Sequence, residues 1–157
     1  MIRKLVLIRH GDAENRRLGE SDAERKLTKR GLKALQEAYP EMLAPLADES
    51  DIQVWSSEAT RALQTAQVAC DVLGVPHDAI EFHKSLYAQD DDFFYGELMA
   101  AEGTVVAVGH IPFMEDVASD LARMPIGFYK GSVACFDVPE EGLGKATLAW
   151  FEQGPKV

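Results

Sequence analysis

The stretch Leu5-Val6-Leu7-Ile8-Arg9-His10-Gly11 is an apolar run that ends in two basic side chains and a glycine. The apolar part predicts a strand buried on both faces, as in a parallel sheet covered by helices. Gly11 lets the backbone turn sharply and approach a ligand closely. Arg9 and His10 would therefore lie at the carboxyl edge of the sheet, where open α/β sheets bind ligands. Arginine offers a fixed fork of donors that suits phosphate, and histidine can act as base, acid or nucleophile.

Length and charge limit the classes of protein to consider. The chain has 157 residues and a formal net charge of −10, which predicts one domain spanning residues 1–157 with a sizeable core. The negative charge argues against a nucleic-acid partner, which requires a basic face, and against an anionic membrane surface. The first apolar run is too short for a signal sequence or a membrane span, and Cys70 and Cys135 fit buried thiols. We therefore expect a cytoplasmic protein.

A second basic side chain follows another predicted strand. Residues 52–55 predict a short strand, and a helix is expected from about Glu58 with Ser57 as its N-cap. Arg61 then falls in the first turn of that helix, at the same sheet edge as His10. The helix N-terminus adds free backbone N–H groups and a dipole that favour an anion. In isolation, Arg61 could equally be an ordinary surface residue.

A second histidine repeats the arrangement of the first. The apolar run 104–108 predicts another buried strand, which is closed by Gly109 and His110. Pro112 suits the first position of the helix that follows. A lone histidine at such a place is more often structural, but two arginines and two histidines on strand exits make a compact anion site. Its size and charge suit a phosphoryl group.

The remaining segments predict the architecture. Residues 12–26 predict a polar loop over the mouth of the site, and residues 28–46 predict a helix that is capped by Thr28 and kinks or restarts at Pro40. A weak strand is expected over 78–83, followed by an irregular acidic stretch over 86–94 that overlaps a short helix over 93–101. The strands of a C-terminal hairpin are expected over 132–138 and 146–151. Three α/β units followed by that hairpin predict a three-layer α/β/α sandwich with a mostly parallel central sheet and an antiparallel C-terminal edge hairpin.

The chemistry of such a site is phosphoryl transfer, which needs mainly positioning and charge stabilisation. Arg9 and Arg61 would bind the equatorial oxygens, and His110 would add a donor. His10 would be the in-line nucleophile and form a phosphohistidine that water hydrolyses. A backbone carbonyl that accepts from its other ring nitrogen would fix the required tautomer. The sequence has no zinc-binding spacing and no glycine-rich nucleotide loop, so we expect metal-independent chemistry without a cofactor.

Several blocks of the sequence resemble the histidine phosphatase (phosphoglycerate mutase-like) superfamily, in the family's order. They are Leu7-Ile8-Arg9-His10-Gly11-Asp12-Ala13, Leu27-Thr28-x-x-Gly31, Ser56-Ser57-Glu58-Ala59-Thr60-Arg61-Ala62-Leu63-Gln64-Thr65-Ala66 and Val108-Gly109-His110-Ile111-Pro112. The resemblance implies a phosphoglycerate mutase-like fold, with His10 as phosphoacceptor in a pocket of Arg9, Arg61 and His110. It also matches Asn15 to an asparagine that some members use near the phosphate.

The short length, the Arg-His-Gly-Asp-Ala opening and the lack of a long inserted lid resemble the SixA-type branch. Proteins of that branch remove phosphate from phosphohistidine on a protein such as a phosphotransfer domain. One departure supports this branch: Ala88 stands where many family members carry a carboxylate general acid. Glu81, Asp90 and Asp91 are nearby, but none is placed at that position. An alkoxide leaving group needs a proton from such an acid, whereas a phosphoramidate leaves more easily.

The leading hypothesis is thus a monomeric phosphohistidine phosphatase that works through a phospho-His10 intermediate. Its partner would be a phosphorylated protein or a small phosphorylated substrate. One alternative is a phosphatase of small phosphomonoesters that uses the same site. A second alternative, from another functional class, is a non-catalytic module that binds a phosphorylated ligand.

Overall fold

The computed structural model describes residues 1–157 and is built on a six-stranded sheet in the order β3-β2-β4-β1-β5-β6. The strands are β1 (Ile2–Arg9), β2 (Ile52–Ser56), β3 (Glu81–Phe82), β4 (Gly103–Gly109), β5 (Val133–Asp137) and β6 (Thr147–Glu152). The first four strands pair in parallel, while β5 runs antiparallel to β1 and β6 antiparallel to β5. The predicted sheet, with its antiparallel hairpin at the C-terminal edge, is confirmed.

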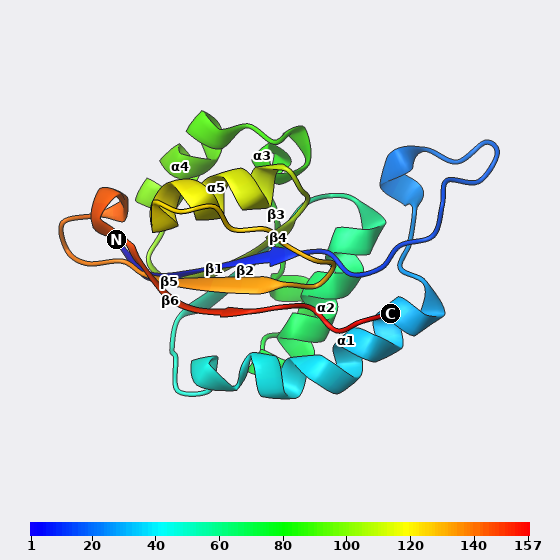
Figure 1. Ribbon diagram of the computed structural model, residues 1–157, viewed down its shortest axis with the longest axis horizontal. Coiled ribbons are helices and arrows are strands. Elements are labelled where there is room, and N and C mark those ends of the chain that lie inside the picture. Colours follow the sequence, from blue (N-terminus) through cyan, green and yellow to red (C-terminus); the bar gives the residue numbers. More distant parts are fainter.

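Helices cover both faces of this sheet (Figure 1). The α-helices are α1 (Lys29–Met42), α2 (Thr60–Leu73), α3 (Lys84–Ala88), α4 (Asp91–Met99) and α5 (Phe113–Ala122). α1 and α2 lie on one face, and α3, α4 and α5 lie on the other. The molecule is therefore a three-layer α/β/α sandwich, as the sequence predicts. None of the helices has the length and apolar character needed to cross a membrane.

The central strands are buried on both faces because their side chains alternate between two apolar clusters. Leu5 and Leu7 of β1 belong to the cluster under α3, α4 and α5, whereas Val6 and Ile8 belong to the cluster under α1 and α2. All four side chains are fully buried. This continuous apolar run is what a central parallel strand requires. Cys70 and Cys135 are free thiols in the same core, as expected.

Several element boundaries differ from the sequence predictions. α2 begins at Thr60 rather than Glu58, and its N-cap is Ala59, because the Ser57 hydroxyl accepts from the backbone N–H of Ala59 in the preceding turn. The stretch 86–94 is not irregular: it holds most of α3 and the start of α4, whose N-cap is Asp90. Both helices are short, so they carry little periodic signal.

The structural roles of two prolines also differ from the sequence predictions. Thr28 does cap α1, but Pro40 neither breaks this helix nor begins a new one, since α1 continues to Met42. A proline in the last turn removes only one backbone hydrogen bond, which packing of the helix face can offset. Pro112 is the N-cap of α5 rather than its first helical residue.

Candidate active site

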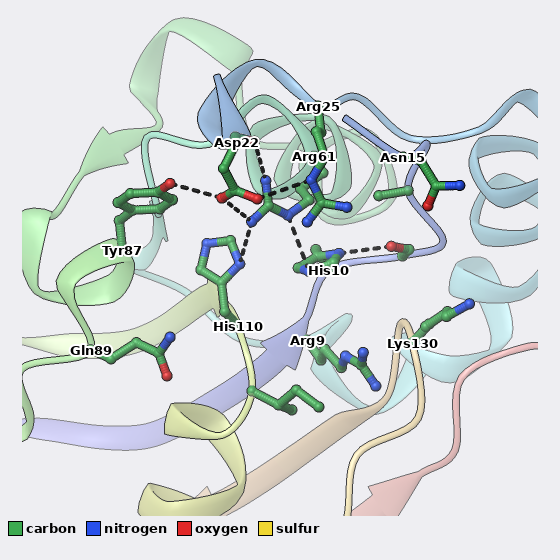
Figure 2. Close-up of a pocket in the computed structure, with 13 residues that line it drawn as sticks. Arg9, His10, Asn15, Asp22, Arg25, Arg61, Tyr87, Gln89, His110 and Lys130 are labelled. Carbon is green, nitrogen blue, oxygen red and sulfur yellow. Dashed lines mark hydrogen bonds and ion pairs between the residues drawn. The ribbon is translucent and has the colours of Figure 1, made fainter. Parts of the chain in front are cut away.

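Arg9, His10, Arg61 and His110 converge on one cavity of about 600 Å³ at the carboxyl edge of the parallel strands (Figure 2). The other residues that line this cavity are Gly11, Ala13, Asn15, Asp22, Arg25, Tyr87, Gln89, Ile111 and Lys130. The structure thus brings together every site residue expected from the sequence, including Asn15.

Strand register explains why these groups meet. β1 and β4 run in parallel with Arg9 opposite Gly109, so the residues that follow, His10 and His110, leave the sheet side by side. The backbone N–H of His10 donates to the carbonyl of Gly109 at 3.0 Å, and that of Ser57 donates to Val108 at 3.0 Å. The three strand exits are therefore fixed to one another by backbone hydrogen bonds.

The ring of His10 has a defined tautomer. Its Nδ1 lies 2.7 Å from the carbonyl oxygen of Gly11, and a carbonyl can only accept, so Nδ1 carries the hydrogen. Its Nε2 lies 3.4 Å from Nε of Arg61, which can only donate. Burial, aided by the nearby positive groups, lowers the pKa of His10 to about 3. The ring is therefore neutral, with its lone pair on Nε2.

Arg61 is a buried arginine at the centre of the cavity, with 5% of its surface exposed. Besides its contact with His10, it donates through Nη1 to the backbone oxygen of Asp22 at 2.8 Å and through Nη2 to the Asp22 carboxylate at 3.0 Å. The Thr65 hydroxyl accepts from Gly11 N and donates to Arg61 O. Thr65 thereby joins the first turn of α2 to the turn after β1.

The ring of His110 packs edge-on beside the ring of His10, with centroids 5.1 Å apart. Its Nδ1 lies 3.5 Å from Nη2 of Arg61, and its Nε2 lies 2.8 Å from the Ser57 hydroxyl. Since Arg61 only donates, Nδ1 of His110 accepts and Nε2 carries the hydrogen. Burial is the main cause that lowers the pKa of His110 to about 4, and the positive charge of Arg61 is the second. The free site thus holds two neutral imidazoles beside two arginines.

Arg9 supplies the second guanidinium. Its Nη1 donates to the backbone oxygen of Phe128 at 2.9 Å, whereas its buried Nε has no hydrogen-bond partner. A buried donor without a partner costs free energy, so this edge of the cavity favours an acceptor. The buried guanidinium of Arg61, the partly buried one of Arg9, the helix N-terminus of α2 and the nearby Lys130 together make an anion-binding site in a negatively charged molecule.

The comparison with protein families agrees with this site. The family model described as the histidine phosphatase superfamily (branch 1) matches residues 5–85. The chain belongs to the histidine phosphatase superfamily. This match includes Arg9, His10 and Arg61, and it confirms the resemblance found in the sequence. A search of curated proteins gives no significant match.

Solved structures share the superfamily fold over nearly the whole chain. The protein histidine phosphatase SixA complexed with tungstate is 24% identical, with a TM-score of 0.80, and the likeness covers 96% of each chain. A SixA structure from Agrobacterium tumefaciens is 23% identical, with a TM-score of 0.77, over 96% of this chain and 97% of that one. A phosphoserine phosphatase mutant from Entamoeba histolytica is 17% identical, with a TM-score of 0.66, over 96% of each chain.

This superfamily member has one carboxylate in its cavity, and sequence reasoning missed it. Asp22 accepts at Oδ2 from Arg61 and from the Tyr87 hydroxyl at 2.8 Å, and at Oδ1 from Nε of Arg25 at 3.0 Å. Burial alone would raise the pKa of Asp22, but the hydrogen bonds from Tyr87 and Arg61 lower it to about 2. The only feature of the sequence that could have pointed to Asp22 is the opposite charge three residues later, at Arg25.

The residues considered as a general acid do not line the cavity. Ala88 ends α3 and carries no acid, Asp90 caps α4 by accepting from Phe93 N, and Asp91 lies in the first turn of α4. Glu81 lies on β3, 3.5 Å from His83. Each carboxylate is thus directed to a local partner. No group of three or more His, Cys, Asp or Glu side chains is placed to hold a metal ion.

Proposed function

We propose that this protein is a phosphohistidine phosphatase that receives the phosphoryl group on Nε2 of His10. The observation that carries the proposal is the fixed tautomer of His10. Its Nδ1–H is held by the Gly11 carbonyl at 2.7 Å, and its Nε2 is unprotonated and open to the cavity beside Arg61. A neutral imidazole with an oriented lone pair is a competent nucleophile.

The first step transfers the phosphoryl group in line. The lone pair of His10 Nε2 forms a bond to phosphorus as the bond from phosphorus to the substrate nitrogen breaks, and that bonding pair stays on the substrate imidazole. Water then attacks phosphorus, loses a proton to solvent, and releases inorganic phosphate. The bonding pair returns to His10 Nε2, so the ring regains its neutral form and no proton need be placed on it.

Arg9, Arg61 and His110 would stabilise the charge on the transferred group. Loose phosphoryl transition states spread charge over the equatorial oxygens, and preorganised donors in a buried site stabilise that charge strongly. A phosphoryl dianion also favours the protonated form of His110, because an opposite charge raises the pKa of a histidine. Asn15 adds an amide at the cavity wall. These groups supply the neutralisation without requiring a metal ion.

The cavity chemistry favours phosphohistidine over phosphate esters. The single carboxylate in the cavity, Asp22, is ionised at neutral pH and cannot donate a proton. Alkoxide leaving groups require that proton, whereas an imidazole that already carries a proton on its second nitrogen leaves as a neutral ring without it. The fold likeness to the protein histidine phosphatase SixA supports the same substrate class. A phosphorylated protein is the expected form of the substrate.

A comparison of substrates tests the proposal. Turnover of a phosphohistidine-bearing protein and of p-nitrophenyl phosphate would be measured in a chelated buffer, for wild type and His10→Ala. We expect strong preference for phosphohistidine and loss of both activities in the variant. Efficient hydrolysis of p-nitrophenyl phosphate, without a preference for phosphohistidine, would assign the site to small phosphomonoesters instead. A folded wild type that binds phosphate but turns over neither substrate would be a binding module.

A further inference from the structure

The mechanism above leaves Asp22 without a role, although its contacts are among the most extensive in the cavity. Asp22 belongs to the short 3-10 helix Asp22–Glu24 in the loop between β1 and α1. Figure 2 shows its carboxylate between Tyr87 and Arg61, so it joins the loop to α3 and to α2. The side chain keeps 48% of its surface exposed, which leaves it accessible from the mouth of the cavity.

The carboxylate and the nucleophile contact different nitrogens of the same guanidinium. Nε of Arg61 lies 3.4 Å from His10 Nε2, while Nη2 lies 3.0 Å from Asp22 Oδ2. In-line displacement places the nucleophile and the leaving group on opposite sides of phosphorus. A phosphoryl group held along Arg61 and attacked by His10 therefore directs its leaving group away from His10, into the mouth that Asp22 and Tyr87 line.

Asp22 retains hydrogen-bonding capacity there. An ionised carboxylate has about four acceptor positions, and Asp22 uses two on Oδ2, for Arg61 and Tyr87, and one on Oδ1, for Arg25. One position on Oδ1 remains for a ligand. Asp22 can therefore accept a hydrogen bond from a substrate, and its ionisation means that it cannot supply a proton.

The leaving group of phosphohistidine fits an acceptor of this kind. An imidazole has two nitrogens, one bonded to phosphorus and the other free to carry a proton. When the free nitrogen is protonated, the phosphorus–nitrogen bond breaks to leave a neutral imidazole, and that proton stays where it is. A carboxylate that accepts from this N–H favours the protonated form, because an adjacent negative charge raises the pKa of an imidazole. An alcohol leaving group has no second position for the proton.

We infer that Asp22 is a specificity-determining residue, which accepts a hydrogen bond from the free ring N–H of the substrate's phosphohistidine and thereby selects phosphoramidates over phosphate esters. This inference rests on the proposed function, since it names the group that recognises the substrate of that site. The same negative charge disfavours a departing alkoxide. Asp22 thus favours departure of a protonated imidazole and disfavours departure of an alkoxide.

The test is the substitution Asp22→Asn, assayed with N-phosphoimidazole and p-nitrophenyl phosphate. The amide oxygen of asparagine can still accept from Arg61 and Tyr87, whereas an amide nitrogen in place of Oδ1 removes the charge, the acceptor proposed for the substrate and the hydrogen bond from Arg25. We expect kcat/KM for N-phosphoimidazole to fall about tenfold or more, as for loss of a charge-assisted hydrogen bond. For p-nitrophenyl phosphate we expect kcat/KM to stay unchanged or to rise by up to about threefold, because the departing phenolate needs no N–H acceptor and no longer meets the Asp22 charge.

Glu14→Gln is the matched control, because it removes one negative charge from the same loop outside the cavity. Glu14 pairs with Arg17 and Lys26 and does not line the site. We expect this variant to keep the wild-type ratio of the two activities. Thermal unfolding of all three proteins would verify that the folds are equally stable.

The outcomes separate the inference from the proposed function. Equal losses on both substrates would mean that Asp22 only positions Arg61. No loss on either substrate would mean that it has no part in selection. Either result overturns the inference. Failure of the proposed function would appear without any change at Asp22, as an absence of preference for N-phosphoimidazole in the wild-type protein or as activity that survives in His10→Ala.

Discussion

Nδ1 of His10 lies 2.7 Å from the backbone carbonyl oxygen of Gly11, the next residue along the chain. This contact fixes which nitrogen of the ring faces the cavity. It arises from the turn that ends β1, because the chain leaves the sheet there and directs a carbonyl back toward the preceding side chain. The local sequence thus builds both the histidine and the acceptor that orients it. The proposed nucleophile is prepared before any substrate arrives.

Arg61→Ala should remove at least about 3 kcal/mol of transition-state stabilisation, as measured when one preorganised donor is removed from an active site. The guanidinium is buried and contacts both His10 and His110. The measurement is kcat/KM on a phosphohistidine substrate. Arg3→Ala is a suitable control, because Arg3 is exposed near the other end of β1. Near-normal turnover in Arg61→Ala would contradict the proposed pocket. His110→Ala should cost a similar amount or a little less.

Both site histidines should stay neutral well below neutral pH. Burial lowers the pKa of His10 to about 3 and that of His110 to about 4. A lowered histidine pKa means that the neutral ring persists on acidification. We expect the ring resonances of both residues in NMR spectra to stay unshifted from about pH 8 to about pH 5, below the ordinary histidine midpoint near 6.5. A midpoint close to that ordinary value in the folded protein would show that the rings are solvated.

The same pKa shifts link folding to pH. In the unfolded chain both histidines take up protons as the pH falls through about 6.5, whereas in the folded chain they do not until about pH 4 or below. The unfolded state therefore binds more protons in that window. The free energy of unfolding should decrease as the pH falls from about 7 to about 5. Urea denaturation at the two pH values measures this change. Replacement of both histidines by glutamine should reduce the dependence on pH.

The block Leu27-Thr28-x-x-Gly31 supports the loop that carries Asp12. The Thr28 hydroxyl donates to the Asp12 carboxylate at 2.8 Å and accepts from Gly31 N at 2.9 Å. A Cβ on Gly31 would lie 2.6 Å from the backbone oxygen of Asp12. Gly31→Ala should therefore destabilise the fold by about 1–3 kcal/mol through overpacking. Gly96→Ala is the matched control: a Cβ there meets nothing within 4 Å, so alanine should raise helix stability by up to about 1 kcal/mol. Equal effects of the two substitutions in urea denaturation would contradict the packing argument.

The residues that the sequence located correctly share one property. Arg9, His10, Arg61 and His110 each follow an apolar strand directly or lie in the first turn of the helix after it. Strand order and register then bring them together without further information, since parallel strands end at a common edge. The core and the layers follow from the same apolar runs, whose burial is close to complete.

Asp22 and Tyr87 could not be located in this way. Asp22 lies in a polar loop without periodicity, and Tyr87 lies in a short helix, α3, which the sequence did not reveal. Their positions depend on a contact between segments 65 residues apart, the 2.8 Å hydrogen bond from the Tyr87 hydroxyl to the Asp22 carboxylate. Loop placement of this kind is decided by tertiary contacts rather than by local propensity. The start of α2 was missed for a different, local reason: the Ser57 hydroxyl accepts from the backbone N–H of Ala59 in the turn before the helix.

The central claim is that the phosphoryl group passes through Nε2 of His10. The most direct measurement is rapid alkaline quench of the enzyme during turnover of ³²P-labelled phosphohistidine protein, followed by mapping of the labelled peptide. Alkali preserves phosphoramidates and destroys acyl phosphates. We predict an alkali-stable, acid-labile label on His10 that forms and decays at rates compatible with turnover, and no label in His10→Gln. A variant that turns over normally without His10, or a label that maps to another residue, would contradict the account.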